Sequence, residues 1–123
     1  MAILAAVLVP TVTSKIKEAN VGSAKSEIGS IISAAKSVAI SETAKGNTTM
    51  TVADFKAALK AECGSELGAK IDAASKGYTV TFEVVENNTK IKVQSTEYTE
   101  AKLESTIDGI KIQEANPNPN PNP

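Results

Sequence analysis

Apolar side chains recur at steps of three and four residues through the first third of the chain, which predicts one long amphipathic helix. The apolar stripe consists of Val21, Ala24, Ile28, Ile31, Ala35 and Val38. Lys45 and Gly46 supply a stop, because glycine readily ends a helix. A continuous helix from Ala2 to about Ala44 would be on the order of 60 Å long, so a domain of this size cannot cover all of it.

The run Ala2–Val9 is apolar throughout and is followed by Pro10. No basic residue precedes the run, so it is not predicted to be a signal peptide. Eight helical residues rise about 12 Å against roughly 30 Å of hydrocarbon core, so the run is too short to span a membrane. A proline inside a helix removes a backbone hydrogen bond, and we therefore predict a kink at Pro10. The apolar half, residues 2–10, is expected to project from the domain, and residues 11–45 form the amphipathic half.

A second, shorter helix is predicted after a loop at Gly46–Thr49. Thr51 and Asp54 form a start that resembles a capping box. The apolar face of this helix consists of Val52, Phe55, Leu59 and Cys63, which makes Cys63 a small core residue, with a reactive or intermolecular thiol as the alternative. The segment Ser65–Lys76 is either a short helix interrupted by Gly68 or a connection rich in turns.

From Tyr78 the apolar period changes to two, which predicts a strand with one buried face over Tyr78–Val85. We expect a hairpin with Asn87-Asn88 as its two-residue turn, because asparagine tolerates positive φ. Such a turn places apolar side chains together on one face and opposite charges on the other. The expected pairs are Val84 with Ile91, Phe82 with Val93, and Glu83 with Lys92.

A third strand is predicted at Ile110–Ile112, with Asp108-Gly109 as a bulge or bend before it, whereas Thr96–Glu104 is polar and ambiguous. The fold class is therefore α+β, with a long kinked N-terminal helix packed against a small antiparallel sheet. We predict a stem helix over residues 1–45 and a globular head over 46–115, with a short helix and a three-stranded antiparallel sheet. The Asn-Pro repeat at 116–123 is predicted to be a disordered tail.

Composition narrows the classes of function. The chain has 13 basic and 14 acidic residues, and every basic residue is Lys, so nucleic-acid binding is not predicted for the head. The absence of His removes the commonest general base and metal ligand, and the single Cys excludes an internal disulfide. We therefore predict no enzyme, no cofactor and no metal site. The C-terminal carboxylates, which are Glu97, Glu100, Glu104 and Asp108, form a loose run without the spacing of a calcium loop.

Residues 2–19, "AILAAVLVPTVTSKIKEA", resemble the second half of the N-terminal segment of type IV pilins. In that family a methylated Phe follows a cleaved leader, the apolar run ends in Ile-Leu-Ala-Ala, and a proline comes next. Ile3-Leu4-Ala5-Ala6 and Pro10 match the end of this run, and Ala19–Ser37 continues it with small residues. The processing-site Gly, the first Phe and the docking Glu of the family are absent, so the resemblance implies that Met1 follows a truncation.

The resemblance implies a structural subunit of a type IV pilus, with the pilin fold and with adhesion, motility or DNA uptake as the possible roles of the filament. The implied partners are identical subunits and the pilus assembly machinery in the membrane. The implied location is a cell-surface filament, after a stage in the cytoplasmic membrane. The residues expected to pack in the filament core are Ala2, Ile3, Leu4, Ala5, Ala6, Val7, Leu8 and Val9, before the kink at Pro10.

Two alternatives stay open at the level of sequence. A pseudopilin of a type II secretion or competence system has the same N-terminal signature. A calcium site near the C-terminus or a fully helical head would favour it, and the sequence predicts neither. A soluble or membrane-surface binding module with an amphipathic N-terminal helix is the alternative from a different class.

Overall fold

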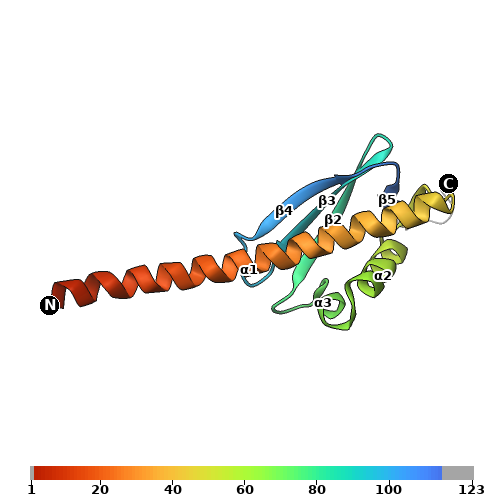
Figure 1. The fold of residues 1–123 in the computed structure, drawn as a ribbon. Helices are drawn as coiled ribbons and strands as arrows, with labels where there is room; N and C mark the ends of the chain where they lie inside the picture. Colours follow the sequence, from red (N-terminus) through yellow and green to blue (C-terminus); the bar gives the residue numbers. More distant parts are fainter. Residues whose placement is uncertain (1, 115–123) are drawn as a thin grey trace, which may run out of the picture.

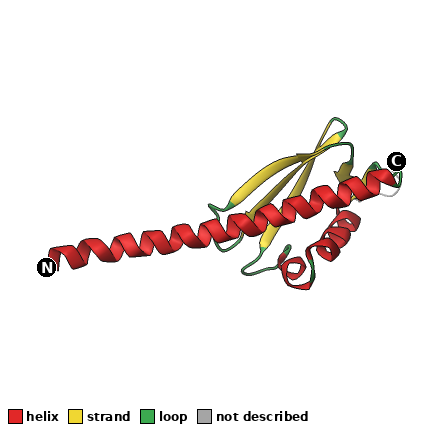
Figure 2. Cartoon of the chain, in the orientation of Figure 1, coloured by secondary structure: helices red, strands yellow, loops and turns green. Residues whose placement is uncertain are grey.

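The computed structural model describes the backbone of residues 2–114 and the side chains of residues 19–114. This part of the chain is α+β, with a long N-terminal helix and a small three-stranded antiparallel sheet, as predicted (Figures 1 and 2). Its elements are α1 (Ala2–Ala44), β1 (Thr49–Thr51), α2 (Val52–Cys63), α3 (Ser65–Lys70), β2 (Tyr78–Val85), β3 (Asn88–Ser95), β4 (Lys102–Ile107) and β5 (Lys111–Gln113). The predicted tail at 116–123 lies outside the described residues.

Helix α1 has 43 residues, which corresponds to a length of about 65 Å at 1.5 Å per residue. Its second half packs in the head, and its first half extends beyond it (Figure 1). In the head, α1 contacts α2 on one side and strands β3 and β4 on the other. Helix α1 is therefore the central element of the head, and the sheet and the α2–α3 pair cover its opposite sides.

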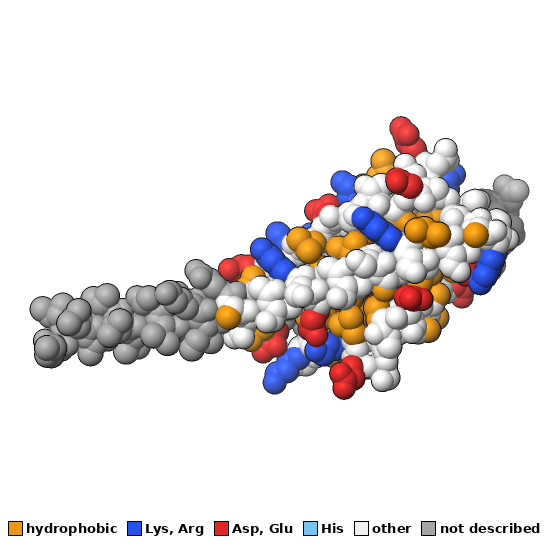
Figure 3. Space-filling view, viewed as in Figure 1, with side chains coloured by type: hydrophobic (Ala, Val, Ile, Leu, Met, Phe, Trp, Pro, Cys, Tyr) orange, Lys and Arg blue, Asp and Glu red, His pale blue; other side chains and the backbone are white. Residues whose placement is uncertain are grey.

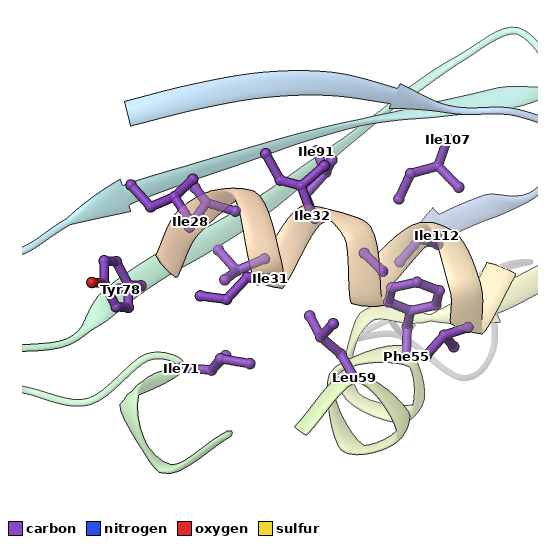
Figure 4. Packing of buried hydrophobic residues seen from close by; sticks show 14 of the residues in the cluster. Ile28, Ile31, Ile32, Phe55, Leu59, Ile71, Tyr78, Ile91, Ile107 and Ile112 are labelled. Atoms are coloured by element: carbon purple, nitrogen blue, oxygen red, sulfur yellow. The ribbon is translucent and has the colours of Figure 1, made fainter. Parts of the chain in front are cut away.

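The buried side of α1 matches the predicted stripe, with Ile32 and Ala39 added to it. The buried residues of α1 are Ala24, Ile28, Ile31, Ile32, Ala35, Val38 and Ala39, whereas Val21 is half-buried. Figure 4 shows the isoleucines of α1 between Ile91 on the sheet side and Leu59 on the α2 side. The buried stripe is wider than predicted because α1 is covered from two sides. The predicted three-four pattern describes a helix that is covered on one side only.

Gly29 lies in the interior of α1, where an added Cβ would meet no atom within 4 Å. Glycine in a helix costs roughly 0.5–1 kcal/mol relative to alanine, because the unfolded chain loses more conformational freedom on folding. We expect Gly29→Ala to raise the free energy of unfolding by about that amount, measured by urea denaturation. Gly68→Ala is the control and should destabilise. An unchanged or lower stability of Gly29→Ala would contradict the expectation.

Helix α2 begins as predicted, because the Thr51 side chain accepts a hydrogen bond of 3.1 Å from the backbone N–H of Asp54. Val52, Phe55 and Leu59 are buried on its inner face, and Cys63 is half-buried against the core. Cys63 is thus a core-contacting residue. Burial, followed by the charge of Glu62, raises the pKa of its thiol, so the neutral thiol is favoured.

Gly68 does not interrupt helix formation, as the sequence suggested, but lies within α3. A Cβ at Gly68 would come within 2.6 Å of the carbonyl oxygen of Lys60 in α2. The two short helices therefore pack with their backbones in close approach, which only glycine permits at this position.

The β2–β3 hairpin forms with its predicted faces but in a different register. Phe82 pairs with Ile91, and Glu83 with Lys90, so the turn consists of Glu86-Asn87 and not Asn87-Asn88. Glu86 has the positive φ, 59°, that the turn requires. Moving the turn by one residue changes each pairing by two positions, so the same faces stay buried. Phe82 still meets an apolar residue, whereas Val84 now pairs with Thr89.

The third strand of the antiparallel sheet is β4, at Lys102–Ile107, and the prediction that residues 110–112 form it is wrong. Strand β5 instead pairs in parallel with β1, in a separate two-stranded sheet. The predicted bend at Asp108-Gly109 is present, with φ of 78° at Gly109. It turns the chain away from β4, and Lys111 then donates a hydrogen bond of 2.9 Å to the carbonyl of Thr48.

The buried hydroxyl of Thr89 joins the two sheets. It donates to the carbonyl of Ile110 over 2.8 Å and accepts from the N–H of Ile112 over 2.9 Å. These two backbone groups lie at the start of β5, where Thr89 supplies the partner that a neighbouring strand would otherwise provide. The contact also fixes the register of β3 relative to β5, because a shifted hairpin would place another side chain beside Ile110 and Ile112.

Candidate assembly surface

The stem, defined as residues 2–23 of α1, carries the residues predicted to pack in a filament core. Ala2–Val9 lie in the helix, which continues through Pro10. Their side chains lie outside the described part of the structure, so the core packing and the kink at Pro10 stay predictions. Among the described side chains, burial begins at Ala24, and the stem extends from this point without another element beside it (Figure 1).

No helix in the described part of the chain is long and apolar enough to cross a bilayer.

The outward face of α1 within the head bears small polar side chains. The exposed serines follow each other at steps of three and four residues and are Ser23, Ser26, Ser30, Ser33 and Ser37. In Figure 3 this helix face is mostly white, and hydrophobic side chains gather along both of its edges. Because these side chains are small, the backbone of α1 can approach a neighbouring surface closely at this flat face.

Exposed apolar side chains lie on the sheet side of α1. Ile40 is 71% exposed and Leu103, on β4, is 38% exposed. Beside Ile40 is a hollow of about 190 Å³, whose wall consists of Lys36, Ala39, Ile40, Thr106, Ile107 and Asp108. An isoleucine this exposed buries apolar area only if another surface covers it, which makes the strip between α1 and β4 a candidate contact surface.

A polar cluster lies where the stem joins the head. The Tyr78 hydroxyl donates to the Glu27 carboxylate, and the Lys70 ammonium lies 3.2 Å and 3.4 Å from the two carboxylate oxygens. We call Glu27, Lys70 and Tyr78 the neck cluster. The hollow beside it, about 310 Å³, is also lined by Lys76, Glu97 and Tyr98. Charges of both signs thus line this hollow with Glu27, from α3, from the loop before β2 and from the loop after β3.

The neck cluster shifts the pKa values of Glu27 and of Tyr78. The Tyr78 hydrogen bond and the Lys70 ammonium lower the pKa of Glu27 and outweigh the effect of partial burial. Burial, followed by the neighbouring Glu27 charge, raises the pKa of Tyr78. At neutral pH the cluster is therefore a carboxylate held by a neutral phenol and an ammonium, an arrangement that holds structure and has no group poised to exchange protons.

The free energy of unfolding at acidic pH should depend on the ionisation of Glu27. Folding lowers its pKa below the ordinary value of 4.5, so its contribution to stability is complete above that pH and is lost as the pH falls through the folded value. We expect the difference in unfolding free energy between the unmodified chain and Glu27→Gln to shrink between about pH 7 and about pH 3, as measured by urea denaturation. A constant difference over this range would contradict the assignment.

No cluster of three or more His, Cys, Asp or Glu that could hold a metal lies in the described part of the chain. The prediction that the chain is not an enzyme stays a prediction.

Sequence reasoning did not find the neck cluster. Glu27 falls outside the apolar stripe and looks like a solvated helix residue, and its partners lie 43 and 51 positions away. No local spacing joins residues so distant. The one available signal is that Glu27 directly precedes Ile28, at the edge of the buried stripe, where a carboxylate needs a partner.

No family model, curated protein or solved structure matches the chain in comparisons with known proteins.

Proposed function

We propose that this chain is a structural filament subunit of the type IV pilin class, which polymerises through the first half of α1. The observation that carries the proposal is the division of α1, a helix of 43 residues whose second half packs in the head and whose first half extends beyond it. A helix does not extend this far from a small domain unless something outside the domain covers it.

The sequence of the stem identifies what could cover it. Every residue of the helical run Ala2–Val9 is apolar, so contact with a single partner face would leave part of the run in water. Several copies of the same run, packed around a common axis, would cover all sides. Ala2, Ala5 and Ala6 permit close approach between such helices.

The head is compatible with the same role. A sheet laid on the C-terminal half of a long helix is the layout that the resemblance to pilins implies, and the flat outer face of α1 and the exposed Ile40 offer surfaces for neighbouring heads. A contact between different surfaces of successive copies generates a helical filament when the rotation between copies does not close into a ring. The proposed partners are therefore identical subunits, with the membrane assembly machinery acting before the subunit reaches the cell surface.

The proposal is tested in the cells that produce the chain. An antibody raised against the head is used for immunogold electron microscopy, and filaments sheared from the cells are probed by immunoblot. We expect labelled filaments in the unmodified strain. Leu4→Glu should abolish them at unchanged protein level, because a buried unpaired carboxylate in the filament core costs several kcal/mol per subunit.

Asn87→Glu is the matched control, since it adds the same charge at the exposed tip of the β2–β3 hairpin. Filaments should persist in this variant. Detection of the unmodified chain only in the soluble fraction, or normal filaments in Leu4→Glu, would overturn the proposal.

A further inference from the structure

The apolar anchoring of α1 begins at the point where the stem leaves the head. Ala24 and Ile28 are the first buried residues of the helix, and Val21, one turn before Ala24, is partly buried against the core. Residues before Ala24 are exposed or half-buried wherever their side chains are described. The direction of the stem therefore depends on contacts made close to this boundary. Lys25 and Glu27 are the charged residues there, and Glu27 is bonded to other elements of the head.

Glu27 is held from two separate directions. Tyr78 reaches it from the first residue of β2, and Lys70 from the last residue of α3. Both hydrogen bonds involve a charged group, and such bonds are about twice as strong as neutral ones. One side chain of α1 is thus tied both to the sheet side and to the α2–α3 side of the head.

The two partners of Glu27 are themselves fixed to each other. Ile71, next to Lys70, forms a β-bridge with Tyr78. Gly77, next to Tyr78, packs so closely on Lys70 that a Cβ there would come within 2.5 Å of the Lys70 carbonyl oxygen. The Gly77 N–H is in turn bonded to the Thr96 hydroxyl at 2.9 Å. The backbones from which the Lys70 and Tyr78 side chains extend are therefore fixed to each other.

We propose that the neck cluster is a clamp that fixes the direction of the stem relative to the head. When the Glu27 contacts are removed, the stem is expected to pivot near Ala24 while the core around Ile31 stays packed. The effect is amplified by length, because the 22 residues before Ala24 span about 33 Å, and a pivot of about 10° displaces the end of the helix by about 6 Å. The clamp is a property of the single subunit and does not depend on the proposed assembly.

The test measures the distance between two spin labels in the full chain at dilution, where subunits stay separate. One label is placed at Ser14→Cys in the stem and the other at Asn87→Cys in the head, with Cys63→Ser to remove the natural thiol. Glu27→Ala and Tyr78→Phe should broaden the distance distribution by about 3 Å, because Ser14 lies about 15 Å from Ala24 along the helix and a pivot of about 10° moves it by that amount. The unfolding midpoint of each variant is measured in parallel.

The matched control is Glu42→Ala, which removes a carboxylate of the same helix that is bonded to Asn47 and Lys45 at the far end of the head. Its distribution should equal that of the unmodified chain. A distribution that stays unchanged in Glu27→Ala and Tyr78→Phe would overturn the clamp and leave the cluster a merely stabilising contact. Equal broadening in Glu42→Ala would overturn it as well. If Glu27→Ala does not fold, Tyr78→Phe, which removes only one hydroxyl, decides the question by the same readout.

Discussion

Phe55→Ala is expected to lower the free energy of unfolding by about 3–5 kcal/mol, the range for removal of a buried ring. Phe55 is 0% exposed and is the largest fully buried side chain of the described core. Its ring meets that of Phe82 edge to face, with centroids 5.5 Å apart. Truncation loses the burial of the ring, leaves a cavity between α1 and α2, and removes an aromatic contact across to β2.

The measurement is urea denaturation of the unmodified chain and the variant, followed by a probe of secondary structure. Phe55→Leu is the matched control, because it keeps an apolar side chain of comparable reach and should cost about 1.5 kcal/mol or less. A loss below about 1 kcal/mol in Phe55→Ala would mean that the core collapses around the missing ring and that α2 is not held through Phe55.

Thr89→Val is expected to lower the free energy of unfolding by about 2–6 kcal/mol, although the two side chains have nearly the same shape. The substitution removes the hydroxyl that serves the Ile110 carbonyl and the Ile112 N–H, and these groups are buried at the junction of the two sheets. Each buried backbone group that loses its partner costs about 1–3 kcal/mol.

Hydrogen exchange separates this effect from a general loss of stability. The Ile112 amide should exchange faster in Thr89→Val than expected from the change in global unfolding alone, because its acceptor is the missing hydroxyl. Thr81→Val, on the exposed face of β2, is the matched control and should change stability by about 0.5 kcal/mol or less. An equal effect of the two substitutions would contradict the role of Thr89.

The parts of the fold that follow from local patterns were predictable from the sequence. The three-four spacing of Ala24, Ile28 and Ile31 predicted the buried side of α1, and Thr51 with Asp54 predicted the start of α2. The alternation after Tyr78 predicted β2 and the buried face of the hairpin. In each case, a few neighbouring residues carry the whole signal.

The remaining errors share a physical cause, since they depend on residues far apart in the chain. Strand β4 shows no alternation, because it is an edge strand whose residues are mostly exposed. Strand β5 pairs with β1 across about half of the sequence, and nothing near Ile110 distinguishes that parallel partner from an antiparallel one. The turn at Glu86 was missed because asparagine next to it has the stronger preference for positive φ.

The parts of the candidate assembly surface also differ in whether the sequence predicts them. The apolar run Ala2–Val9 is visible in the sequence because it is contiguous. The neck cluster is not, because α1, α3 and β2 bring Glu27, Lys70 and Tyr78 together only after folding.

The described chain ends at Glu114, beside Glu42 and Asn47 at the far end of α1 from the stem. Glu114 is therefore separated from Ala2 by nearly the full length of α1, about 65 Å. If stems form the axis of a filament, a peptide or small protein fused after this point would be carried on the periphery, repeated once per subunit and clear of the polymerising helices. The subunit would then serve as a scaffold for dense, regularly spaced display of a foreign sequence.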